Sequence, residues 1–192
     1  MQKIVVKDYD PKWAEDFQAF KTYYERLLTG IDCDIQHVGS TSVEGLAAKP
    51  IIDMDIIAFS EMGKREIICR LETVGYIHQG DLGIKGREAF ARTSGKVPCS
   101  EPDRDWPDHH LYCCMKGIES LENHLKLRDY LRENPEAVKE YSELKKLLAG
   151  KYIDDIESYV EDKTDFIVKI LSLSGMKTDI LTDISDQNKK KR

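Results

Sequence analysis

The fold is decided by the stretch HVGSTSVEGLAAKPIIDMD, residues 37–55. After a polar turn of small residues that begins at Gly39, its pattern predicts a strand over residues 51–59. Asp53 and Asp55 lie two positions apart within this apolar strand, and alternate side chains of a strand share a face. Two ionised carboxylates so close together in an apolar strand repel each other and need a compensating cation. We therefore expect Asp53 and Asp55 to bind a divalent metal ion, Mg²⁺ or Mn²⁺.

The turn before this strand has the composition of a phosphate-binding loop. A glycine at position 39 lets the backbone approach a phosphate group closely. The residues that follow, Ser40, Thr41 and Ser42, offer hydroxyls and backbone N–H groups to phosphate oxygens. We expect Gly39, Ser40, Thr41 and Ser42 to bind phosphate beside the metal.

Composition restricts the classes of function. A net charge of −6 argues against general binding of nucleic acid, whose partners usually carry a basic surface. Five cysteines without a C-x-x-C pair are typical of reduced thiols in a cytosolic protein. The N-terminus lacks a signal-peptide core, and no apolar run approaches the roughly 20 residues of a membrane span. We expect a cytoplasmic protein with no membrane partner.

Periodicity predicts an α/β (α+β) portion followed by helices alone. Strand patterns over 34–38, 51–59, 88–93 and 110–115 alternate with helical patterns over 11–28 and 62–73. From residue 119 onward only helical spacing remains. The predicted organisation is an α/β domain over 1–117, a helical region over 118–175 packed on it, and a disordered polar tail over 176–192.

The turn and the Asp-x-Asp strand together are similar to the nucleotidyltransferase fold of the polymerase-beta superfamily. The full motif set resembles the GrpB family, in matching order over about residues 4–171. Besides residues 37–55, the blocks are Tyr9-Asp10-Pro11-x-Trp13, Leu127-Arg128-Asp129-Tyr130-Leu131-Arg132, Asn134-Pro135, Tyr141-x-x-Leu144-Lys145 and Tyr159-x-x-x-Lys163. The resemblance implies a nucleotidyltransferase-like mixed sheet with flanking helices, followed by a C-terminal helical bundle.

Two functions follow from this resemblance. The first is a Mg²⁺-dependent nucleotidyltransferase that moves a nucleoside monophosphate from an NTP to a small-molecule acceptor. The second is a non-catalytic module with a degenerate transferase site that binds a nucleotide or a CoA precursor. GrpB-like domains are fused to dephospho-CoA kinase in some bacteria, which implies a functional link to that enzyme.

One departure from the superfamily bears on this choice. Many of its transferases supply a third carboxylate from a later strand, but residues 109–114 here read HHLYCC, without an acid. His110 either replaces the missing acid as a ligand or general base, or lies hydrogen-bonded beside the site without a chemical role.

Basic residues elsewhere are candidates for holding the phosphates. Guanidinium and ammonium groups match phosphate oxygens, and Lys145 and Lys163 each follow a tyrosine at helical spacing. Each can instead be a surface residue that pairs with the many acids, and no function is expected for His78 or His124. The candidates are Lys49, Arg87, Arg92, Arg128, Lys145 and Lys163.

Overall fold

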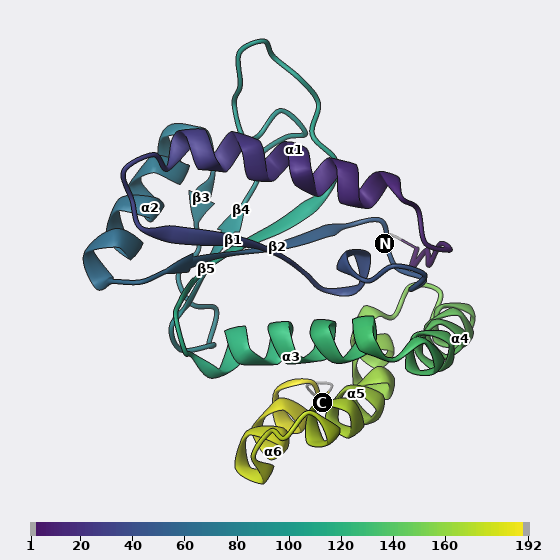
Figure 1. The fold of residues 1–192 in the computed structure, drawn as a ribbon. Coiled ribbons are helices and arrows are strands. Elements are labelled where there is room, and N and C mark those ends of the chain that lie inside the picture. The colour runs from purple at the N-terminus through teal and green to yellow at the C-terminus, as the bar shows by residue number, and fades with distance from the viewer. Residues whose placement is uncertain (1–2, 190–192) are drawn as a thin grey trace.

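The structure is a computed structural model that describes residues 3–189, and its centre is a five-stranded mixed sheet (Figure 1). The strand order is β1-β2-β5-β4-β3. Strands β2 and β5 run parallel, and the other neighbours are antiparallel. The strands are β1 (Cys33–Val38), β2 (Ile52–Ala58), β3 (Ile77–His78), β4 (Arg87–Ala91) and β5 (His109–Met115).

Helices cover both faces of this sheet (Figure 1). The helices are α1 (Lys12–Leu27), the short 3-10 helix η1 (Ser40–Ser42), α2 (Glu61–Thr73), α3 (Glu119–Glu133), α4 (Pro135–Lys151), α5 (Ile156–Leu173) and α6 (Thr178–Gln187). The predicted mixed sheet with flanking helices, followed by helices alone, is confirmed.

Strand β2 divides its side chains between two environments. Ile52, Met54 and Ile56 are buried in the main core with residues of α1 and α2. The alternate residues point to the other face, where Ile57 packs with Leu121 of α3. Asp53 and Asp55 belong to this second face, so the predicted sharing of one face by the two acids is confirmed.

The C-terminal helices are fastened to the segment between β1 and β2. Val43 and Leu46 of that segment are buried in one cluster with Val138 and Tyr141 of α4. The Tyr141 ring stacks on Phe166 of α5 with 4.5 Å between the centroids. This core places α4 and α5 directly beside the polar turn.

Helix α6 corrects the prediction of a disordered tail. Residues 178–187 form a helix, and Leu181 and Ile184 are buried against Leu171 and Met176. The apolar residues recur at three- and four-residue spacing, which is enough to bury one face of a short helix. The prediction is therefore wrong for residues 178–187, while residues 190–192 lie outside the described part of the chain.

The structure also gives the state of the cysteines and the length of the apolar helices. All five cysteines are free thiols. Across residues 3–189, no helix has both the length and the apolar composition needed to cross a membrane.

Candidate functional site

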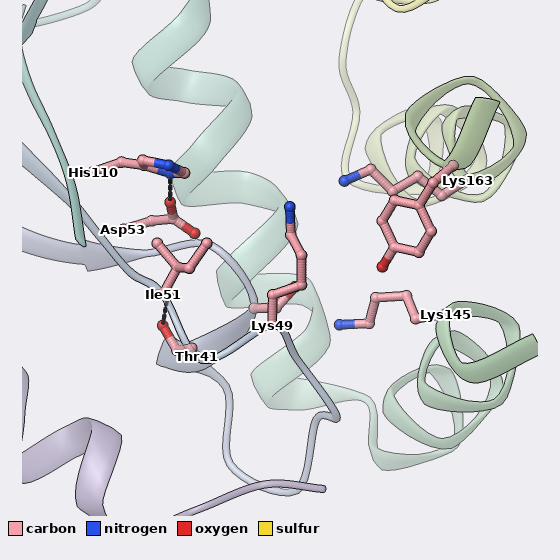
Figure 2. A pocket seen from close by; sticks show the side chains of 9 residues that line it. Thr41, Lys49, Ile51, Asp53, His110, Lys145 and Lys163 are labelled. Carbon is pink, nitrogen blue, oxygen red and sulfur yellow. Dashed lines mark hydrogen bonds and ion pairs between the residues drawn. The ribbon is translucent and has the colours of Figure 1, made fainter. Parts of the chain in front are cut away.

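A cavity of about 190 Å³ lies between the end of β2 and the helices α4 and α5. Side chains from the turn, from both central strands and from the two helices point into it (Figure 2). Its lining residues are Ser40, Thr41, Lys49, Ile51, Asp53, His110, Lys145, Tyr159 and Lys163. The structure thus brings together predicted residues that are separated by more than a hundred positions in the sequence.

The turn at Gly39 is shaped around the Asp53 carboxylate. Gly39 has φ +67° and ψ −170°, a conformation that is essentially restricted to glycine. A Cβ atom at this position would lie 2.3 Å from Asp53 Oδ2. Glycine therefore lets the backbone of the turn lie directly against the acid.

The hydroxyls of this turn have different roles. Thr41 Oγ1 donates to the Ile51 carbonyl at 3.2 Å, and Ser42 Oγ donates to the Gly39 carbonyl at 2.6 Å. The first bond joins the turn to the residue just before β2, and the second lies within the turn. Ser40 and Thr41 line the cavity, whereas Ser42 does not.

His110 occupies the position beside the first acid. It is the register partner of Asp53 across the parallel β2–β5 pair. Its Nδ1 donates to Asp53 Oδ1 at 2.8 Å, and its side chain is 52% exposed. The sequence predicted no acid in this strand and left two roles open for His110, and the structure places its imidazole in contact with Asp53.

The second acid is paired with a histidine that sequence reasoning missed. Asp55 is fully buried, and its Oδ2 accepts from His124 Nδ1 of α3 at 2.7 Å. Burial lowers the pKa of His124, but the charge of Asp55 and this hydrogen bond outweigh burial and raise that pKa above its ordinary value. The signal was present: His124 follows the buried Leu121 by three residues and therefore lies on the inward face of α3.

Three lysines meet on the opposite wall of the cavity. Lys145 of α4 is 3% exposed, and its ammonium lies 4.5 Å from the Tyr141 ring centroid. Lys163 of α5 and Lys49 lie 5.3 Å and 5.9 Å from the Tyr159 ring centroid. The amines of Lys145 and Lys163 point from the two helices toward Lys49 and Asp53 (Figure 2).

Burial and mutual repulsion weaken the basicity of the two helical lysines. Burial, together with the charge of Lys163, holds the pKa of Lys145 well below its usual range. Burial, together with the charge of Lys49, lowers the pKa of Lys163 to about 8, although Asp53 acts in the opposite direction. The lowered pKa values indicate that too few negative groups lie near these lysines to balance their charge.

The predicted arginines lie outside the cavity. Arg87 stacks 4.4 Å from the Tyr112 ring centroid, and Arg92 pairs with Asp108 Oδ1 at 2.7 Å. Arg128 donates to Gln36 Oε1 at 2.7 Å and to the His37 carbonyl at 3.0 Å. These contacts hold elements of the fold together, and Arg128 in particular fastens α3 to β1.

The two acids predicted to bind a metal differ in access, because Asp53 lines the cavity whereas the fully buried Asp55 does not. Asp55 Oδ1 is buried without a hydrogen-bond partner among the described residues, so one oxygen on this face is unused. Within residues 3–189, no three His, Cys, Asp or Glu side chains gather as a closed metal site. Mg²⁺ is usually held by one or two carboxylates, with water and substrate phosphates completing its shell. Two carboxylates match that ligand composition, and metal binding by Asp53 and Asp55 stays a prediction.

Comparison with known proteins identifies the family. The family described as GrpB protein matches residues 3–173. The chain belongs to the GrpB family. It is 32% identical to the conserved protein GrpB from Enterococcus faecalis, whose crystal structure superimposes with a TM-score of 0.72 over 93% of this chain and 98% of that chain.

The GrpB chain is also similar to a longer protein and, more weakly, to a solved polymerase structure. It is 35% identical to YqkA of Bacillus subtilis over 86% of this chain, and it spans 46% of the length of that longer protein. The Cid1 poly(U) polymerase with MgGTP bound is 16% identical and gives a TM-score of 0.49 over 77% of this chain and 44% of that chain.

Proposed function

We propose that this GrpB protein is a Mg²⁺-dependent nucleotidyltransferase that moves a nucleoside monophosphate from an NTP to a small-molecule acceptor. One observation carries the proposal: across a single cavity, the acid-bearing face of β2 stands opposite three lysine amines. Carboxylates that can hold a metal and cations that can hold phosphates are the two requirements of phosphoryl-transfer chemistry.

The groups at and beside the cavity have distinct roles in this reaction. Asp53, which lines the cavity, and Asp55, which lies buried next to it on the same strand face, would hold Mg²⁺ or Mn²⁺, which would neutralise charge on the transferring phosphoryl group. Gly39 and Ser40 of the turn bind phosphate oxygens beside the metal. Lys49, Lys145 and Lys163 neutralise the charge that develops on the leaving pyrophosphate.

His110 is the residue best placed to activate the acceptor. Its Nδ1 is held by Asp53, which leaves Nε2 as the ring nitrogen that can accept a proton. The exposure of this side chain gives an acceptor hydroxyl access to it. We assign His110 as the general base that removes the acceptor proton, in place of a third carboxylate.

The size of the cavity supports a role in binding the phosphates of the nucleotide. About 190 Å³ is less than the roughly 300–1,000 Å³ of pockets that enclose a whole small molecule. A second groove of about 650 Å³ shares Lys49 and Ile51 with the cavity. The cavity thus suits the phosphates, and the remainder of the ligands extends into this groove.

A binding module without turnover is the second candidate, and the lack of an acid on β5 favours it. Incubation with Mg²⁺, each labelled NTP and a metabolite extract separates the two functions. Pyrophosphate release supports the transferase. A metal-dependent rise in melting temperature with nucleotide, without release or label transfer, supports the module. A CoA precursor belongs in the same melting series, because the resemblance to domains fused with dephospho-CoA kinase makes it a candidate ligand.

Replacing Asp53 by asparagine should abolish the rise in melting temperature that Mg²⁺ and nucleotide produce together. The change keeps the shape of the side chain but removes the charge that the metal needs, so any pyrophosphate release should fall about a hundredfold or more. The matched control is Asp183→Asn on the exposed surface of α6, which should keep both. An unchanged metal-dependent rise in Asp53→Asn would show that the acid is structural.

A further inference from the structure

The three lysines of the cavity are poorly balanced by negative charge. Among the described residues that line it, Asp53 is the one carboxylate, and Asp53 already accepts a hydrogen bond from His110. Three ammonium groups beside a single carboxylate repel one another, and the repulsion is strongest where water is excluded.

Lys145 is the most buried of the three lysines. Its side chain is 3% exposed, and its Nζ has no hydrogen-bond partner among the described residues. Polar and charged groups from several elements face the same cavity or lie beside the amine. These are Tyr141 on its own helix, Tyr159 and Lys163 on α5, Lys49 before β2, Asp53 on β2, His110 on β5, and Ser40 and Thr41 on the turn.

A buried ammonium without a partner is unfavourable, so the lysine sheds its proton instead. The direction of the pKa of Lys145, well below its usual range, agrees with this geometry. Protonation of Lys145 is therefore disfavoured in the free protein, and a sufficiently negative ligand beside the amine favours it again.

We propose that Lys145 is a specificity-determining residue that takes up a proton when a polyphosphate binds, and so selects di- and triphosphates over monophosphates. A single phosphate brings about −1.5 to −2 charges, which the amines of Lys49 and Lys163 balance. Each further phosphate brings charge that is balanced only when Lys145 is protonated. The inference rests on the phosphate-binding part of the proposed function and not on turnover.

The dependence on pH follows from this proton. Below the pKa of Lys145 in the free protein, the amine is already charged and polyphosphate affinity is greatest. Above it, one proton must be taken up for each ligand bound, so affinity falls about tenfold per pH unit until the pKa of the complex is passed. Lys163, with a pKa of about 8, is largely protonated at neutral pH and adds to the uptake only in more alkaline solution.

Calorimetric titration at about pH 7 in buffers of different ionisation enthalpy measures the protons taken up. ATP should bind with uptake of about one proton and AMP with markedly less. Lys145→Met should bind ATP without this uptake. Its ratio of ATP affinity to AMP affinity should fall at least about tenfold, the change in affinity that equals one pKa unit. Lys145→Arg, whose charge is permanent, should bind ATP without uptake.

The neighbouring lysine provides a matched control. Lys146 points away from the cavity and pairs with Asp8, and its side chain is 48% exposed. Lys146→Met should therefore keep both the uptake and the preference. Binding of ATP to the wild-type protein without proton uptake, or uptake unchanged in Lys145→Met, would overturn the proposal.

Inorganic tripolyphosphate and orthophosphate separate this inference from the proposed function. Tripolyphosphate that binds with proton uptake at Lys145, while ATP fails to bind, would support the charge selection and refute the nucleotide specificity. If neither tripolyphosphate nor ATP binds, both proposals are refuted. If ATP binds and releases pyrophosphate without uptake, the transferase stands and the role of Lys145 does not.

Discussion

Replacing His124 by leucine should lower the free energy of unfolding by about 3 kcal/mol in mildly acidic solution, which is the lower end of the range for breaking a buried ion pair. The variant leaves the Asp55 carboxylate, which is fully buried, without the imidazolium that balances its charge. The lower end applies because His124 itself is 30% exposed. Urea denaturation of both proteins measures the difference.

Two variants control for the loss of packing. Asp55→Leu combined with His124→Leu removes both charges and should recover most of the lost stability, because an apolar pair of similar volume replaces a buried ion pair at little cost. His78→Leu breaks the His78–Glu88 pair, whose atoms are 2.8 Å apart and partly exposed, and should cost at most about 1 kcal/mol. A double variant as unstable as His124→Leu would show that the charge of Asp55 is not the cause.

The sign of the pH dependence follows from the raised pKa of His124. A group whose pKa is higher in the folded state than in the unfolded state contributes fully below its unfolded pKa of about 6.5. That contribution is lost as pH rises through the higher folded pKa. The gap in stability between the wild type and His124→Leu should therefore narrow on going from pH 6 toward pH 9, leaving the neutral hydrogen bond.

Replacing Gly39 by alanine should disrupt both the fold and the site. An L-residue at this backbone conformation costs about 1–3 kcal/mol, and the new Cβ would lie 2.3 Å from Asp53 Oδ2. Relief requires the carboxylate to leave its position beside the turn. We expect a lower melting temperature and loss of the metal-dependent response to nucleotide.

Gly117 separates the two causes. It also has a positive φ, of +83°, but a Cβ atom there would meet nothing within 4 Å. Gly117→Ala should show the backbone penalty alone and keep the response to metal and nucleotide. If Gly39→Ala also retains that response, the close packing of the turn against Asp53 does not position the acid.

Local patterns predicted the elements because each is decided by neighbouring residues. The spacing of apolar residues in β2 placed Asp53 and Asp55 on one face. The tyrosine–lysine steps in α4 and α5 placed Lys145 and Lys163 each on one helical face with a tyrosine, and the structure turns both faces toward the cavity. Strand order is decided by pairing between distant segments. The contact of His110 with Asp53 therefore had to be taken from the structure, because it depends on β5 lying parallel to β2.

The predicted arginines do not line the cavity, and a histidine for which no function was expected contacts the second acid. Arg92 and Arg128 have the chemistry of phosphate ligands, but their partners, Asp108 and Gln36, come from segments that the sequence does not show to be adjacent. His124 lies in a helix whose packing partner could not be read from α3 alone. Charge and spacing nominate residues, but only the tertiary arrangement assigns their partners.

Because Val43 and Leu46 pack against α4, the part of the site that binds phosphate is completed later in synthesis than the two acids. A ribosome completes the turn and both acids long before it has made the helix that carries Lys145, and Lys163 follows later still. A nascent chain therefore contains both carboxylates well before it contains the lysines proposed to bind phosphate. Ligand binding should begin only once α5 has been synthesised. Binding to chains from translation stalled at successive lengths measures this directly.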